Sequence, residues 1–118
     1  MIIGTGIDMI ECHRIKKQIT NDKFIDRILT IQEKQRFNQL SDHRKVEYLA
    51  GRFAAKEAYA KAKGTGIGNT LSWRDIEVIN NGQGKPILKD MTDEQQVIHL
   101  SITHTDTFAA AFVIIESK

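Results

Sequence analysis

A single acidic residue stands within a run of basic residues in the middle of the chain. Glu57 lies between Lys56 and Lys61 in RFAAKEAYAKAKGTG, residues 52–66, and the run ends in glycines. Carboxylate oxygens bind Mg²⁺, and ammonium groups bind phosphate as point charges. The segment therefore indicates a site for a metal and phosphates. An i,i+4 ion pair between Glu57 and Lys61 on a solvated helix explains the same residues without any ligand.

A second carboxylate, Asp8, stands in the apolar segment 2–10, IIGTGIDMI. Burying this carboxylate without a partner is costly, so it needs a lysine, backbone donors or a cation. Mg²⁺ is commonly held by one or two carboxylates together with waters and substrate phosphates. Asp8 and Glu57 are therefore candidate ligands of one Mg²⁺ ion, although their spacing alone does not bring them together.

Other catalytic arrangements have less support. Ser101, His104 and Asp106 have the residue types of a hydrolase triad, but Ser101 and His104 would point to opposite faces of a strand. The glycines of GTGIG, residues 64–68, follow a helix and lack the Gly-Lys-Ser/Thr of a nucleotide-binding P-loop. The remaining histidines have no ligand spacing: His13, His43 and His99.

Composition limits the class of protein. The chain has 118 residues, 41% of them hydrophobic, which suits one domain with its own core. A net charge of +2 is too small to favour nucleic acid as a partner, and no apolar run approaches the length of a membrane span. The amino terminus lacks the basic start of a signal peptide. Cys12 is the only cysteine, so we expect a reduced, cytoplasmic setting without disulfides.

Two elements must position the carboxylates. Residues 2–10 predict a buried strand, and Ser41 or Asp42 caps a predicted helix that reaches Lys63 and stops at Gly64. At about 100° per residue, Glu57 shares a helix face with small and apolar side chains. A second, basic face carries Arg52, Lys56, Tyr59 and Lys63.

The rest of the chain predicts short helices followed by strands. Thr30 and Glu33 match a capping box, so a helix should start there and reach about Leu40. Helices that cluster early and strands that cluster late indicate an α+β fold. The other predicted elements are helices at 11–19 and 23–29, strands at 76–79 and 86–88, a turn at 80–86, and a hairpin of strands 97–105 and 108–115.

Four motifs together resemble one known family. GIDMIE, RFAAKEAYAKAKGTG, GKP at 84–86 and SITHT at 101–105 are similar, in this order, to the holo-acyl-carrier-protein synthases, the small class of 4′-phosphopantetheinyl transferases. The similarity spans nearly the whole chain. It implies a single domain over 1–118, with one long helix packed on an antiparallel sheet, and a homotrimer with active sites between subunits.

The resemblance also implies a reaction. Coenzyme A would donate its phosphopantetheine arm to a serine of apo acyl carrier protein, release adenosine 3′,5′-bisphosphate, and so support fatty acid biosynthesis. Asp8 and Glu57 match the family's Mg²⁺ ligands, and Lys61 matches a lysine that we assign to the phosphates. Larger relatives carry a third acid where this chain has Ile10, so water should complete the metal site. The general base stays open between Glu57, a metal-bound water and a side chain near Glu33.

Two further sets of contacts follow from the resemblance. Arg52 or Lys56 would bind the 3′-phosphate, and the neighbouring subunit would supply the nucleotide end of the site. The full nucleotide set is Arg52, Lys56, Lys61, Gly64, Lys85, Pro86, His104 and Thr105. Carrier proteins are acidic, and the basic segment 14–27 would bind them, although a solvated amphipathic helix has the same pattern. Its proposed contacts are Arg14, Lys17, Lys23, Phe24, Ile25 and Arg27.

Two functions of other classes explain part of the sequence. A nucleotide- or nucleic-acid-binding module without chemistry accounts for the lysines but not for Asp8, and aromatic residues make up only 7% of the chain. A purely structural oligomer accounts for Gly51, which suggests close packing within the long helix, but it predicts nothing at Asp8 or Glu57.

Overall fold

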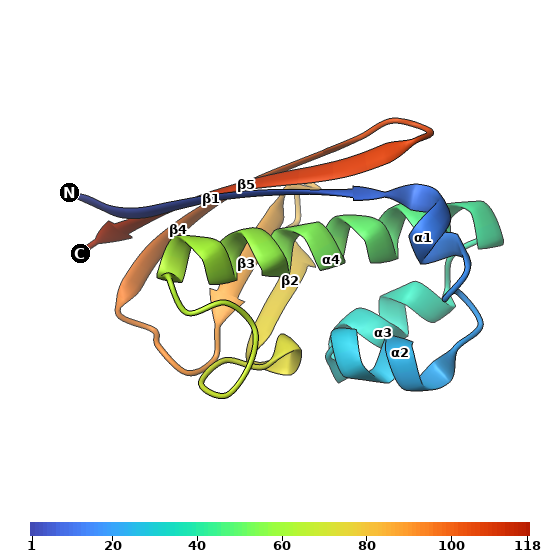
Figure 1. Ribbon diagram of the computed structural model, residues 1–118, viewed down its shortest axis with the longest axis horizontal. Helices are drawn as coiled ribbons and strands as arrows, with labels where there is room; N and C mark the ends of the chain where they lie inside the picture. The colour runs from blue at the N-terminus through green and yellow to red at the C-terminus, as the bar shows by residue number, and fades with distance from the viewer.

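One long helix, α4 (Asp42–Lys63), lies along a three-stranded antiparallel sheet (Figure 1). The computed structural model describes all of residues 1–118. The strand order is β1-β5-β4, so β1 and β4 are the two edges, and a separate hairpin pairs β2 with β3. The strands are β1 (Ile2–Glu11), β2 (Ile76–Asn80), β3 (Pro86–Asp90), β4 (Gln96–His104) and β5 (Phe108–Ser117). The predicted α+β fold with a long helix on an antiparallel sheet is confirmed.

Helix α4 begins and ends where the sequence predicts. The Ser41 side chain accepts a hydrogen bond from the Arg44 amide, and Gly64 closes the helix with φ of 86°, a conformation that favours glycine. The helix is buried on nearly all sides, because the sheet covers one side and the shorter elements cover the other. The predicted basic face was therefore wrong, since Lys56 and Tyr59 have no exposed surface.

Strand β1 packs directly on α4 through two glycines. A Cβ atom added to Gly6 would lie 1.9 Å from the Ala58 carbonyl oxygen, and one added to Gly4 would lie 2.1 Å from that of Ala62. Only glycine allows this close approach. The alanines of α4 and the glycines of β1 thus fix the height of β1 above the helix, two residues before Asp8.

The face of the sheet that points away from α4 is exposed and apolar. Ile7 and Met9 are 63% and 62% exposed, and Ile7 pairs with Phe112 across the strands. Residues 2–10 form the predicted strand, but the expectation that this strand is buried was wrong, since only alternate residues face α4. We call this surface the outer face; its large apolar residues are Ile3, Ile7, Met9, Val97, Phe108 and Phe112.

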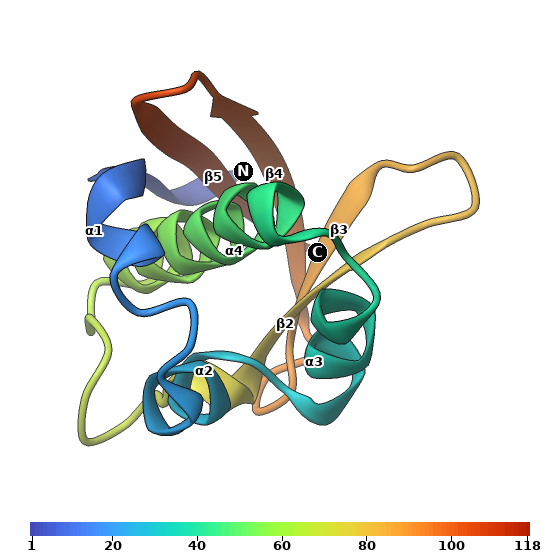
Figure 2. The ribbon, with the colours of Figure 1, turned by 90° about the vertical axis from the view of Figure 1, so that its right-hand side faces the viewer.

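The shorter helices are α1 (Cys12–Lys16), α2 (Asp22–Ile28) and α3 (Ile31–Asn38), with a 3-10 turn at Trp73–Asp75. The helices α2 and α3 lie on the side of α4 that faces away from the three-stranded sheet, whereas α1 lies beside α4 at the end of β1. The Thr30–Glu33 capping box is present, but the first predicted helix ends at Lys16 rather than at residue 19. Figure 2 looks almost along α4 and shows α1 and the projecting β2–β3 hairpin on its opposite sides. None of the helices has the length and hydropathy that a bilayer crossing requires.

Candidate functional site

Asp8 and Glu57 lie together where β1 crosses the second half of α4; we call them the acidic pair. Lys61 joins the group, since its Nζ lies 3.0 Å from Asp8 Oδ1 and 3.1 Å from the Ile7 carbonyl oxygen. Glu57 forms no hydrogen bond or ion pair within the chain. The ion pair between Glu57 and Lys61, which would explain these residues without any ligand, is therefore not formed.

Asp8 lies close enough to Glu57 to affect the ionisation of the Glu57 carboxyl group. Partial burial raises the pKa of Glu57, the negative charge of Asp8 raises it further, and the charge of Lys61 opposes both effects. A cation between the carboxylates would relieve this repulsion. Their hard oxygen ligands fit Mg²⁺, and no group of three or more His, Cys, Asp or Glu side chains has metal-binding geometry. The chain therefore offers a Mg²⁺ ion two carboxylate ligands, and water would fill its remaining coordination positions.

A cavity of about 210 Å³ gathers cationic side chains on the other flank of α4. We call it the arginine pocket; its polar lining includes Arg36, Arg44, Arg52, Asn80 and His104. Gly84 and Pro86 of the predicted GKP turn also border it, so that turn and His104 lie at the same cavity. Arg36 and Arg44 were missed in the sequence, where single basic residues on helices look like solvated surface.

Arg52 is held in place beside this pocket by two neighbouring side chains. Its guanidinium lies over the Tyr48 ring, 4.1 Å from the ring centre, and its Nη2 donates to Asn80 Oδ1 at 3.1 Å. Burial lowers the pKa of Arg52, and only 8% of the residue is exposed. Its buried Nε–H has no acceptor in the chain. A buried charged donor without an acceptor is costly to the fold.

The acidic pair and the arginine pocket lie at opposite edges of the sheet. Asp8 on edge strand β1 is in register with Ala111 on β5, and Ala111 is in register with Ile102 on edge strand β4, which borders the pocket. Two strand spacings separate them by about 10 Å, and α4 lies between. One chain therefore does not bring the acidic pair and the arginine pocket together.

Lys56 is a structural residue in this fold. Its Nζ donates to Glu33 Oε1 at 2.6 Å, to the Ile28 carbonyl at 2.7 Å and to the Trp73 carbonyl at 3.1 Å. All three donors are used and the side chain is fully buried, so Lys56 has no hydrogen left for a phosphate. Glu33 also accepts from the Thr30 and Val78 amides, and this occupied, buried carboxylate is unsuited to act as the general base.

The predicted carrier contacts divide into exposed and buried residues. Arg14, Lys17, Lys23 and Arg27 are exposed on α1, α2 and the turn between them. Ile25 is only 2% exposed and belongs to the core, so its assignment to the carrier surface was wrong. Phe24 is half-buried and stacks on Phe53, with ring centres 6.3 Å apart.

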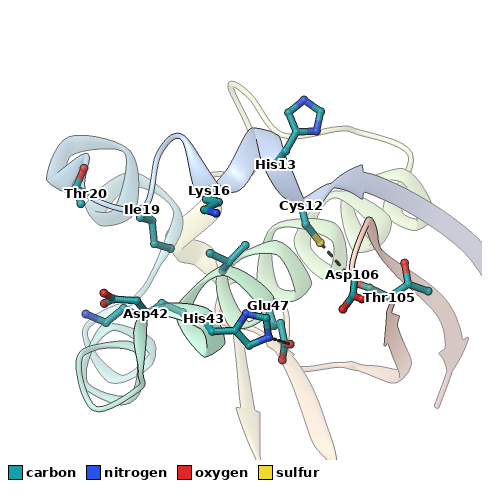
Figure 3. A pocket seen from close by; sticks show the side chains of 12 residues that line it. Cys12, His13, Lys16, Ile19, Thr20, Asp42, His43, Glu47, Thr105 and Asp106 are labelled. Atoms are coloured by element: carbon teal, nitrogen blue, oxygen red, sulfur yellow. Dashed lines mark hydrogen bonds and ion pairs between the residues drawn. The ribbon is translucent and has the colours of Figure 1, made fainter.

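Three other predicted nucleotide contacts lie outside the arginine pocket. Gly64 and Lys85 are exposed, and neither borders that cavity. Thr105 borders a separate cavity of about 670 Å³ between α1, the start of α4 and the β4–β5 turn (Figure 3).

The larger cavity has no catalytic dyad or triad. Cys12 points into it, burial raises the pKa of its thiol, and His13 points away from it (Figure 3). His104 faces Glu47, with Nε2 and Oε2 3.8 Å apart, rather than Asp106. Ser101, His104 and Asp106 therefore do not form the hydrolase triad that their residue types suggest.

Comparison with known proteins decides the family. The profile of the 4′-phosphopantetheinyl transferase superfamily matches residues 4–113. The chain belongs to this superfamily. It is 55% identical over 119 residues to a holo-[acyl-carrier-protein] synthase of Oceanobacillus iheyensis, covering 100% of this chain and 99% of that protein. A synthase of a Geobacillus strain is 57% identical over 117 residues, covering 98% of each chain.

Solved structures of holo-acyl-carrier-protein synthases share the fold. The synthase of Bacillus anthracis, crystallised in complex with CoA (3′,5′-ADP), superposes with a TM-score of 0.93 at 52% identity, covering 100% of this chain and 99% of that one. The synthase of Neisseria meningitidis gives 0.88 at 35% identity, covering 99% of this chain and 100% of that one. The resemblance seen in the four motifs is confirmed, whereas the roles of individual residues stay predictions.

Proposed function

We propose that this enzyme transfers the 4′-phosphopantetheine arm of coenzyme A to a serine of an apo acyl carrier protein and releases adenosine 3′,5′-bisphosphate. The observation that carries the proposal is full-length similarity to holo-acyl-carrier-protein synthases, combined with an acidic pair and a lysine at the matching motifs. A binding module without chemistry would not need two carboxylates that repel each other beside Lys61.

Each half-site has a task in this reaction. The serine oxygen bonds to the phosphorus that carries the pantetheine arm, the pyrophosphate P–O bond breaks, and the bisphosphate leaves with the electron pair. Asp8 and Glu57 would hold Mg²⁺, which when bound neutralises pyrophosphate charge and stabilises the leaving oxygen. Lys61 would bind the same phosphates. The serine proton must pass to a base, and Glu33 is a poor candidate for it because its oxygens are occupied.

The arginine pocket would bind the nucleotide end of coenzyme A. The orphaned Nε of Arg52 supports a phosphate oxygen there, and Arg44 and His104 add positive or hydrogen-bonding groups around it. Of the two predicted ligands of the 3′-phosphate, we keep Arg52. We drop Lys56, because its ammonium group already donates three hydrogen bonds within the chain.

A homotrimer would join the two half-sites. The acidic pair and the arginine pocket flank opposite edge strands, so a closed ring that sets β1 of one subunit beside β4 of the next would face them toward each other. The apolar outer face supplies a surface that such an assembly could bury. Each active site would then take its metal ligands from one subunit and its nucleotide contacts from the neighbour.

The carrier protein would dock on the basic surface of α1 and α2. The exposed charges of Arg14, Lys17, Lys23 and Arg27 suit an acidic partner, because complementary charge speeds and orients encounter. Phe24 is the apolar candidate at this surface, now without Ile25. A nonspecific nucleic-acid interface would call for a denser basic stripe than this one.

Intact mass spectrometry tests the proposed reaction. The protein is mixed with an apo carrier protein, coenzyme A and Mg²⁺, with and without a chelator. We expect the carrier to gain the mass of one phosphopantetheine, and the gain to disappear with chelator. No gain on any of several carriers would refute the transferase proposal, whereas a gain that persists with chelator would refute the metal.

A further inference from the structure

Lys61 occupies the position beside Asp8 that a cation would take. Its ammonium contacts Asp8 Oδ1 at 3.0 Å and the Ile7 carbonyl oxygen at 3.1 Å, so it has two oxygen neighbours from one strand. The Lys61 side chain is 54% exposed, whereas that of Asp8 is only 17% exposed. The aspartate is thus fixed by the fold, and the lysine reaches it from solvent with a long, flexible side chain.

We propose that Lys61 holds Asp8 in the metal-free enzyme and is released when a divalent cation binds the acidic pair, so that metal loading frees its ammonium for the phosphates. This inference rests on the metal site of the proposed function and concerns how the chain's own residues respond to it. Lys61 acts here as a positioning residue for Asp8 before it acts on substrate.

The charges of the group support such an exchange. Asp8 and Glu57 carry two negative charges against one on Lys61, and Glu57 has no partner of its own. The pair therefore attracts a second cation even while Lys61 is in place. A divalent ion that binds both carboxylates would repel an ammonium in contact with one of them. The partly exposed ion pair is weak, so its loss costs the fold little.

Release would prepare the site for coenzyme A. With the ion bound, the two carboxylates, the metal and Lys61 together carry a net charge of +1, where the metal-free group carries −1. The charge of the site would thus be positive, and so complementary to the negative pyrophosphate, only after metal loading. Lys61 stands one helical turn after Glu57, so its ammonium, once free of Asp8, can reach a group bound at Glu57.

Mn²⁺ affinity without coenzyme A gives the first test. Binding to the wild type and to K61M, K61R and D8N is measured by electron paramagnetic resonance, with K89M as a control that removes one exposed lysine elsewhere. Because K61M removes a competing cation, we expect it to bind Mn²⁺ about tenfold more tightly than the wild type. K61R and K89M should stay near the wild type, and D8N should lose binding.

A second readout follows Lys61 itself. In the wild type, Mn²⁺ should increase the rate at which an amine-reactive ester modifies Lys61, mapped by peptide mass spectrometry, while modification of Lys89 stays constant. Equal or weaker Mn²⁺ binding by K61M, or Lys61 labelling that does not respond to Mn²⁺, would overturn the exchange. If neither the wild type nor K61M binds Mn²⁺, both the exchange and the proposed metal site are wrong. If both bind equally and D8N does not, only the exchange is wrong.

Discussion

Gly6→Ala should displace Asp8 and lower the transfer rate while the rest of the fold stays native. The added Cβ would lie 1.9 Å from the Ala58 carbonyl oxygen and 2.8 Å from the Ala62 amide nitrogen. Real Cβ atoms essentially never approach a heavy atom closer than 3.0 Å, and the obstacle is helix backbone, which cannot rotate away. Strand β1 must therefore move from α4 at this point.

The size of this movement sets the expected effect. Restoring 3.0 Å at the Ala58 oxygen requires a shift of at least about 1.1 Å at Gly6, and Asp8 is two residues farther along the same strand. Glu57 and Lys61 belong to α4 and would stay behind. A misplacement of about 1 Å costs on the order of 100-fold in rate, and overpacking costs about 1–3 kcal/mol of stability.

The assay compares the transfer rate and the free energy of unfolding of G6A with those of the wild type. Gly82→Ala is the matched control, because an added Cβ there meets no atom within 4 Å and the backbone is not left-handed. We expect G6A to fold but to lose about 100-fold in rate, and G82A to keep both properties. A G6A enzyme with wild-type rate and stability would refute the argument that glycine sets the position of Asp8.

Three other substitutions test separate parts of the structure. K56M should cost about 3–5 kcal/mol in urea unfolding, because it leaves the Glu33 carboxylate buried without its cation; a loss below about 1 kcal/mol would contradict the buried ion pair. Burial disfavours the Asp90 carboxylate, but hydrogen bonds from Lys63 and Thr92 outweigh it and hold the pKa at about 2. Since the folded pKa lies below the unfolded one, this carboxylate stabilises the fold above about pH 4 and ceases to do so as pH falls toward 2. D90N should accordingly cost about 2 kcal/mol at pH 7 and little at pH 2, and a pH-independent loss would contradict it. R52Q should raise KM for coenzyme A about tenfold or more but hardly change KM for dephospho-coenzyme A, which lacks the 3′-phosphate. An equal rise in KM for both donors would show that Arg52 does not bind the 3′-phosphate.

The sequence predicted the elements whose signals are local. The Thr30–Glu33 capping box, the Ser41 cap and the Gly64 stop each depend on a few neighbouring residues, and each is present in the structure. The pairing of Asp8 with the Glu57 region was a hypothesis without a spacing argument. In the fold it depends on Gly4 and Gly6, which bring β1 onto the alanines of α4.

The residues whose roles were predicted wrongly are those whose environment depends on tertiary contacts. Lys56 seemed available for phosphate because helical periodicity cannot reveal that α3 and β2 cover it with Glu33. Ile25 seemed an exposed anchor between basic residues, yet it belongs to the core. The exposure of the outer face could not be predicted for a related reason. An apolar strand has the same sequence pattern whether its second face packs on the protein's own core or forms an open surface.

Subunit complementation tests the central claim most directly, namely a transferase site shared between subunits. D8N removes one metal ligand, and the double variant R44Q/H104A removes two exposed groups of the arginine pocket. The two chains, with different tags, are coexpressed and purified through both tags. In a trimeric ring each mixed assembly keeps one intact site of three, so we predict about a third of the wild-type transfer activity from two chains that are each inactive alone. An inactive mixed assembly, with both chains folded and associated, would contradict the shared site.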